Sequence, residues 1–262
     1  MKSLWKNEMK RMLCEKEFWI TMILGCGIAV WHFVQHVYNA ELFALDVPDN
    51  AYVCWMGANA YRMQSYWYYM IFPLLAVLPC VGGWYDDYHS GYVKSVLLKC
   101  DRKSYFTVKG MIVFLSGGLG VVIPLLLNFL LTATKRPMLY PDPFVAIGPQ
   151  SYCLGSEFYY MYPLLYTLLY LLLDFTMGGF VAVGAMILSV HVNYKFVALT
   201  IPYGLFYFLN CLGAILGTNI FTPNIFLIPG IGIESVVSLV MMAAFALLVI
   251  LAYVWKGRTY EG

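Results

Sequence analysis

The sequence predicts an all-α integral membrane protein: a polytopic bundle of six transmembrane helices, with an amphipathic interface helix at the N-terminus and a short cytoplasmic helix between the second and third spans. Three observations predict this fold class. Only 11% of the residues are charged and 61% are apolar, whereas soluble domains carry about 25% charged residues. Six stretches reach the roughly 20 apolar residues that a membrane span needs. Lys and Arg are concentrated in alternate connecting segments, so lipid is the expected solvent.

The six expected spans leave no room for a separate soluble domain, so residues 1–262 are expected to form a single transmembrane domain. The spans are placed at 18–37, 66–85, 110–131, 162–190, 196–217 and 235–255. The second contains Pro73 and Pro79, which a bundle tolerates when neighbouring groups satisfy the freed carbonyls. The fourth is long, which predicts either a tilt or a bend at Gly178 and Gly179.

The distribution of Lys and Arg in the loops predicts the orientation. If the N-terminus lies inside, 13 of the 16 basic residues fall in inside segments, and only Arg62, Lys135 and Arg136 fall outside. Both termini are therefore expected in the cytoplasm. The net charge of +2 gives no indication of nucleic acid as a partner.

The N-terminal segment, residues 1–16, has the pattern of an amphipathic helix. Its apolar residues recur near i, i+4 spacing, and its lysines line another face; the apolar residues are Leu4, Trp5, Met9, Met12 and Leu13. Such a helix suits the surface of an anionic inner leaflet, where each basic residue contributes about 1 kcal/mol. A simple basic anchor for the first span is the alternative.

The longest inside loop, residues 86–109, also contains an apolar stripe. Tyr92, Val93, Val96 and Leu97 can share one face of a short helix, with Lys94 off that face. This pattern favours a docking element for a soluble partner. A solvated connector, which is the other interpretation, has no need of an apolar stripe.

The same loop carries a sequence of features in a recognisable order. Two acids (Asp86, Asp87) precede Gly91, then the hydrophobic run 96–98, then the segment 101–104 (DRKS), and last the Lys109-Gly110 pair that opens the third span. In this order, and in its six spans and basic N-terminus, the chain resembles the permease subunits of type 2 ATP-binding-cassette transporters. It departs from them in carrying Asp where Glu is usual and in lacking a Pro before Arg102.

The resemblance implies a partner arrangement and a set of docking residues. The partners would be separate ATPase subunits, which bind ATP and magnesium, and a second permease subunit, identical or related; this chain would hold no cofactor. The implied activity is export of a peptide, antibiotic or lipid-like substrate across a bacterial cytoplasmic membrane. The residues expected to couple to the ATPase are Asp87, Gly91, Tyr92, Val96, Leu97, Arg102 and Lys103.

Asp174 stands in the middle of the fourth expected span. A carboxyl group at that depth costs about 2.5–3.5 kcal/mol on insertion scales, so it is expected to be protonated or hydrogen-bonded. Tyr170 and Thr167 fall on about the same helix face. Two interpretations are open: a polar element of a substrate path or subunit interface, and a hydrogen bond that fixes helix packing.

Motifs for catalysis or metal binding are not found in the sequence. It has no GxxxxGK[ST], HExxH or GxSxG segment, so the chain itself is not expected to be an enzyme. His32 and His36 are one turn apart but have no third ligand, and no metal site is expected. The alternatives to a transporter subunit are a channel or membrane scaffold and, third, an intramembrane enzyme.

Two features of the outside segments are open to two interpretations each. Cys54 and Cys153 lie in the long outside segments, where the environment is oxidising, and form either a bond or two free thiols. The proline-containing apolar segment 218–234 is either re-entrant or an interfacial loop.

Overall fold

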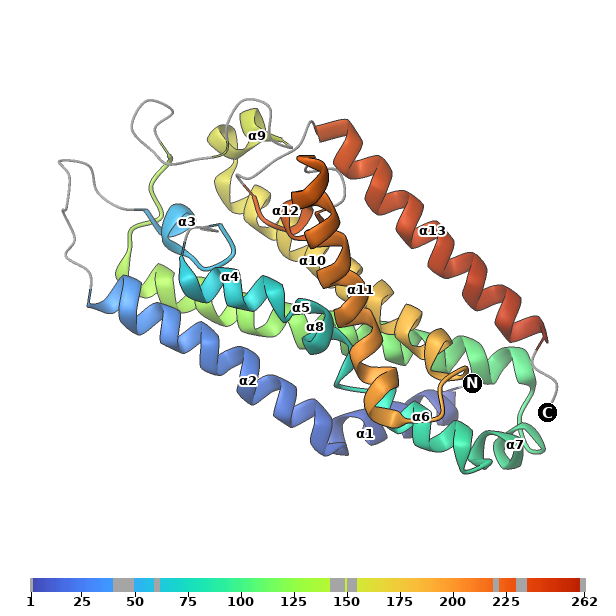
Figure 1. Cartoon of the computed structure of the whole chain (residues 1–262). Helices are drawn as coiled ribbons and strands as arrows, with labels where there is room; N and C mark the ends of the chain where they lie inside the picture. The colour runs from blue at the N-terminus through green and yellow to red at the C-terminus, as the bar shows by residue number, and fades with distance from the viewer. Residues whose placement is uncertain are drawn as a thin grey trace.

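The structure is a computed structural model that describes residues 2–39, 50–58, 62–141, 149, 155–218, 222–229 and 235–259. Figure 1 shows a bundle of long helices with shorter ones at its two ends. The described helical elements are α1 (Lys2–Cys14), α2 (Lys16–Phe33), the π-helix η1 (Val34–Tyr38), α3 (Ala51–Cys54), α4 (Met63–Met70), α5 (Phe72–Val77), α6 (Val81–His89), α7 (Tyr92–Leu97), α8 (Arg102–Lys135), α9 (Ser156–Met161), α10 (Pro163–Ser189), α11 (Lys195–Leu216), α12 (Pro223–Leu227) and α13 (Ser235–Thr259).

The helical fold class and the six long apolar helices are confirmed. Six segments within the described residues are long and apolar enough to cross a membrane, and each overlaps one expected span. They are Lys16–Tyr38, Met63–His89, Arg102–Lys135, Pro163–Ser189, Lys195–Leu216 and Leu239–Lys256. The chain is therefore a multi-pass membrane protein.

The second spanning segment is not one helix but three, α4, α5 and α6. Pro73 lies in the first turn of α5, and Pro79 lies in the turn between α5 and α6. Proline has no backbone N–H and its ring clashes with the carbonyl four residues earlier, which interrupts a helix. Pro124 and Pro202, in contrast, lie inside the continuous helices α8 and α11.

Helix α8 is the central element, with contacts to α1, α2, α3, α5 and α10. Its approach to α10 depends on glycine: a Cβ added at Gly117 would lie 2.8 Å from the carbonyl oxygen of Gly178 and 2.5 Å from the Cβ of Ala182. Helix α10 continues through Gly178 and Gly179, so these glycines do not interrupt the fourth span. They allow two helices to pack closely, as small residues do in membranes.

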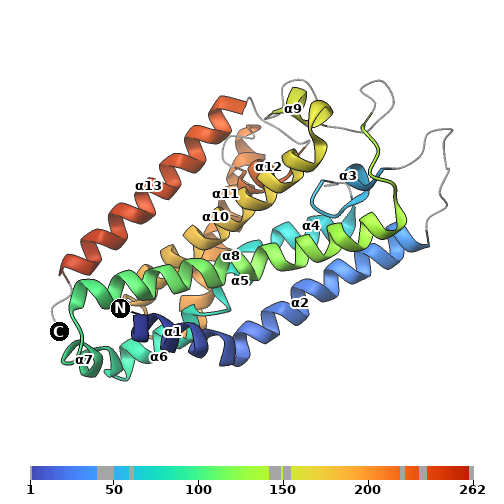
Figure 2. The ribbon, with the colours of Figure 1, turned by 180° about the vertical axis from the view of Figure 1, so that it is seen from behind.

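The two ends of the bundle differ in content. Helices α1, α6 and α7 gather at one end with the beginning of α8 and the end of α13, while α3 and α9 lie at the other (Figures 1 and 2). We call the end with α1 and α7 the inner end, following the orientation that the Lys and Arg distribution predicts. Helices α11 and α13 expose many large apolar side chains, as expected for surfaces that face lipid.

The last expected outside segment is described in part. In residues 222–229, α12 contacts α4, α10 and α11. Leu227 and Ile228 are buried in a hydrophobic cluster that also contains Phe72 and Phe206. This part is therefore packed on the bundle, and whether it enters the membrane stays a prediction. Cys153 lies outside the described residues, so its bond with Cys54 also stays a prediction.

Candidate functional site

Helix α1 is packed into the protein rather than lying free. Met12 is buried in a hydrophobic cluster with Phe18, Trp84 and Ile112, which we call the inner hydrophobic cluster. Leu4, Trp5 and Met9 pack partly against it, while Leu13 is exposed. The apolar face that the sequence predicts is therefore largely covered by protein, chiefly by α8. Contact of α1 with the leaflet surface stays a prediction, and the faces of the helix that protein does not cover would make this contact.

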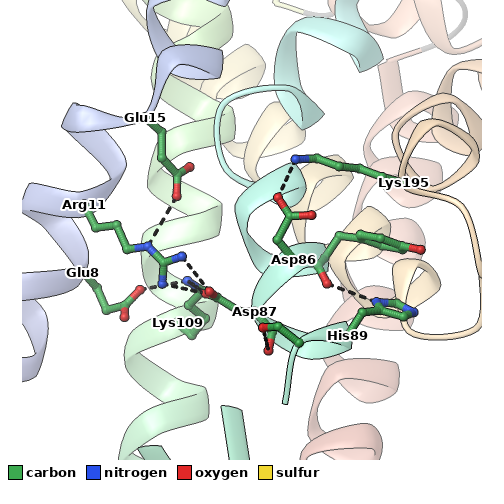
Figure 3. Close-up of polar contacts among 10 residues, drawn as sticks. Glu8, Arg11, Glu15, Asp86, Asp87, His89, Lys109 and Lys195 are labelled. Atoms are coloured by element: carbon green, nitrogen blue, oxygen red, sulfur yellow. Dashed lines mark hydrogen bonds and ion pairs between the residues drawn. The ribbon is translucent and has the colours of Figure 1, made fainter. Parts of the chain in front are cut away.

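Ion pairs join α1 to α6 and α8 at the inner end (Figure 3). The Arg11 guanidinium donates two hydrogen bonds to the Asp87 carboxylate, at 2.8 and 2.6 Å. The Lys109 ammonium lies 2.8 Å from Glu8 Oε2 and 3.2 Å from Asp87 Oδ2. Lys109 is 1% exposed and Asp87 4%. Because buried charges need close partners, each of these side chains fixes the others.

Glu15 is the third carboxylate of this cluster. Its Oε1 lies 3.7 Å from Arg11 Nε, and it fits against α6 because residue 83 is glycine: a Cβ there would meet Oε1 at 2.4 Å. Burial raises the pKa of Glu15 to about 7, although Lys109 and Arg11 act to lower it. Desolvation of the charged form therefore outweighs the attraction of the two cations, and the nearby carboxylates of Glu17 and Asp87 act in the same direction as burial.

We refer to Glu8, Arg11, Glu15, Asp87 and Lys109 together as the inner ion cluster. Beside it, Lys195 at the start of α11 pairs with Asp86 at 2.6 Å and with Glu17 at 3.7 Å. The adjacent acids Asp86 and Asp87 thus bind cations from different helices, and α6 is tied to α1, α8 and α11 just before α7 begins (Figure 3).

Two residues of the loop motif have backbone roles. Gly91, directly before α7, has φ +77°, a left-handed conformation that favours glycine. Asp101 caps α8 by accepting hydrogen bonds from the Ser104 amide and hydroxyl, at 3.2 and 3.3 Å, as Asp at this position commonly does. The glycine and the DRKS segment therefore set where α7 begins and where α8 begins.

The predicted apolar stripe of α7 is divided between the protein and the solvent. Val93 is fully buried in the inner hydrophobic cluster, the one that contains Met12, and Val96 and Leu97 pack partly against it. Tyr92 is 45% exposed and Leu98, just beyond the helix, 89% exposed. Of the stripe residues expected to contact the ATPase, Tyr92 is thus the most exposed, and the docking role itself stays a prediction. The Tyr92 ring also lies 5.4 Å from the Arg11 guanidinium, so α1 contacts α7 as well as α6.

The remaining loop residues lie at three levels of exposure. Asp87 is buried and contacts Arg11 and Lys109 within the chain, and its expected contact with the ATPase stays a prediction. Arg102 is partly buried and Lys103 is exposed.

The inner ion cluster was not predicted from the sequence, because its members are far apart in the chain. One signal was present: Glu8, Arg11 and Glu15 have i, i+3, i+7 spacing and so share a helix face.

Asp174 is fully buried and accepts a hydrogen bond from the Tyr69 hydroxyl, at 3.3 Å. Its neighbours on the same face are buried too: the Tyr170 ring lies 4.9 Å from the Tyr166 ring, and the Thr167 hydroxyl donates to the Pro163 carbonyl. This arrangement is typical of a contact that fixes helix packing between α4 and α10.

The two histidines of the first span do not come together as a chelating pair. His32 lies against the Asn128 amide at 3.2 Å, and both ring nitrogens of His36 face protein, Gln64 at 2.9 Å and Arg62 at 2.9 Å. In the described part of the chain, no group of three or more His, Cys, Asp or Glu side chains could hold a metal ion.

Comparison of the chain with protein-family models, with curated proteins and with solved structures gives no match. Inference about function therefore depends on the order of features in the loop 86–109 and on the geometry of the inner end.

Proposed function

We propose that the chain is the membrane-spanning permease subunit of an ATP-binding-cassette transporter. In this proposal it works with separate ATPase subunits, which bind ATP and magnesium, and with a second permease subunit, identical or related. The complex exports a peptide, antibiotic or lipid-like substrate across a bacterial cytoplasmic membrane, and both termini of the chain lie in the cytoplasm.

One observation carries the proposal: a short helix with an exposed apolar end is fixed to the core of the bundle by buried ion pairs. Tyr92 and Leu98 expose apolar surface at the inner end, which is unfavourable in water by roughly 25 cal/mol per Å². A partner surface removes that exposure. Asp87, five residues before Tyr92, is held by Arg11 and Lys109, so a force on α7 is passed to the spanning helix α8.

The proposed mechanism follows from this connection. An ATPase that changes conformation moves α7, and the inner ion cluster makes α1, α6 and α8 move with it. Such small rigid-body shifts of packed helices are an ordinary route from one site to another. The exposed side chains Tyr92 and Leu98 act as the apolar anchors, and basic residues around them, Arg102 among them, pair with acids at the rim, where charges contribute less to affinity.

The experiment is co-purification of the chain with an ATPase that carries a phosphate-binding loop, comparing Leu98→Asp with Lys94→Ala. Leu98 is the better target than Leu97, because Leu97 also packs inside the chain. We expect Leu98→Asp to release the ATPase or to uncouple its activity, with membrane insertion unchanged, and Lys94→Ala to retain both. Full complex formation and coupled ATP hydrolysis in Leu98→Asp would contradict the proposal and favour a channel or scaffold.

A further inference from the structure

A large apolar groove runs along the lipid-facing side of the inner half of the bundle. Its volume is about 920 Å³. One wall comes from α8 and the other from α13, with α10 between them; Figure 2 shows α8 and α13 on the near side of the molecule. Its lining is almost entirely apolar: Met111, Phe114, Leu115, Phe180, Val183, Val249, Ile250 and Val254 belong to it.

The inner end of the groove has a different chemistry. Lys103, Trp5 and Thr107 line it there, and the Tyr253 hydroxyl donates to the Phe106 carbonyl at 2.6 Å across the two walls. Lys103 is exposed, and no carboxylate of the described residues lies within 4 Å of its ammonium group. A cation and an aromatic ring at the mouth of an apolar groove are typical of the membrane interface.

We propose that the groove binds one anionic phospholipid of the leaflet that α1 and α7 face. One acyl chain lies between α8 and α13, against Met111 and Ile250, and the phosphate pairs with Lys103. This site goes beyond the proposed transport function, and it assigns Lys103 to a lipid phosphate rather than to the rim of an ATPase.

The groove's chemistry selects this occupant. A cavity with these walls does not hold water, which needs polar partners, and an empty one loses the dispersion contacts of its lining. An acyl chain from the surrounding bilayer supplies them. Lys103 then favours an anionic headgroup, because the inner leaflet presents anionic lipids to basic residues near its surface. A second copy of the chain would cover the apolar walls but offers no reason for a cation at the mouth.

The test uses the full chain reconstituted in phosphatidylcholine vesicles that contain a trace of photoactivatable lipid. The probe carries a diazirine in one acyl chain and has either a phosphatidylglycerol or a phosphatidylcholine headgroup. We expect labelled peptides from α8 and α13 that include Met111 or Ile250, with phosphatidylglycerol preferred. Lys103→Gln should reduce that preference by about fivefold, the value of one lysine near a charged surface.

Two matched controls separate headgroup from chain. Lys99→Gln removes an exposed lysine from the same inside segment, outside the groove, and should leave the preference unchanged. Met111→Trp should block labelling by both probes, whereas Leu126→Trp, an exposed position on α8 outside the groove, should not. Equal labelling by the two headgroups in the wild type, or cross-links between copies of the chain at these positions in place of lipid labelling, would overturn the proposal. Unchanged ATPase co-purification in Lys103→Gln keeps this test independent of the transport function.

Discussion

Lys109 and Asp174 are both fully buried ionisable residues on spanning helices, yet their surroundings differ. Lys109, at the inner end, has two carboxylates within 3.2 Å, both of them buried, and one of these, Asp87, also binds Arg11. Asp174 has one hydrogen bond, from the neutral hydroxyl of Tyr69. Lys109 is therefore a charged group with charged partners, whereas the surroundings of Asp174 suit a neutral carboxyl group.

The proposed mechanism assigns the transmission of movement to the first region. Removing one partner of a buried ion pair costs several kcal/mol, so these pairs are expected to stay joined when α7 moves. A single neutral hydrogen bond contributes about 1 kcal/mol, enough to orient two helices but not to link three. The inner ion cluster is therefore the mechanical element of our account, and Asp174 a packing contact.

The largest expected effect comes from Lys109→Met. It leaves Glu8 buried without its cation and Asp87 with Arg11 alone, which should destabilise the protein by about 3–5 kcal/mol. Thermal unfolding in detergent measures it, with the exposed Lys99→Met as the matched control. If Lys109→Met unfolds at the wild-type temperature, the ion pairs do not hold the inner end and the comparison fails.

Glu15 sharpens the comparison, because it is the carboxylate of the cluster without a full counterion. Its pKa is raised from an ordinary 4.5 to about 7, chiefly by burial. The folded state therefore binds more protons than the unfolded state between these values, and stability should fall as pH rises through that range. Glu15→Gln should reduce this dependence, measured as the unfolding temperature at pH 5 and pH 7.5. The same slope in wild type and variant would show that Glu15 titrates as an ordinary exposed acid.

Asp174 should give the smallest effect of the three. Asp174→Asn keeps a hydrogen-bond acceptor for Tyr69 and should be close to wild type, whereas Asp174→Leu leaves the Tyr69 hydroxyl buried and unpaired, at a cost of about 1–3 kcal/mol. Assembly yield and unfolding temperature report both. A loss of transport in Asp174→Asn at normal stability would instead place Asp174 on a substrate path.

The spans were predictable because hydropathy and length determine them locally. The three-part form of the second span was also within reach, since Pro73 and Pro79 lie six residues apart and each removes a backbone donor. The packing role of Gly117 and Gly178 was not, because it depends on which helix lies opposite. Periodicity identifies an apolar face of α1 but not what covers it; much of that face packs against α8, and contact of α1 with the leaflet surface stays a prediction.

The candidate site shows the same limit. In the loop 86–109, Gly91 and Asp101 have local backbone roles that the sequence can indicate, whereas coupling to an ATPase stays a prediction. The pairing of Lys109 with Glu8 joins residues 101 positions apart, and nothing in a single sequence links them. The contacts of Asp87 with Arg11 and Lys109 were likewise beyond reach, and its expected contact with a partner stays a prediction.

We propose that the exposed end of α7 docks on an ATPase, and photo-crosslinking from position 98 would detect this contact in cells. A benzophenone amino acid replaces Leu98, and the same amino acid at Tyr140, an exposed residue that follows the C-terminal end of α8, is the control. The account predicts that irradiation of intact cells links position 98, but not position 140, to a protein with a GxxxxGK[ST] loop. Cross-links from position 98 only to lipid, or to proteins without that loop, would contradict it.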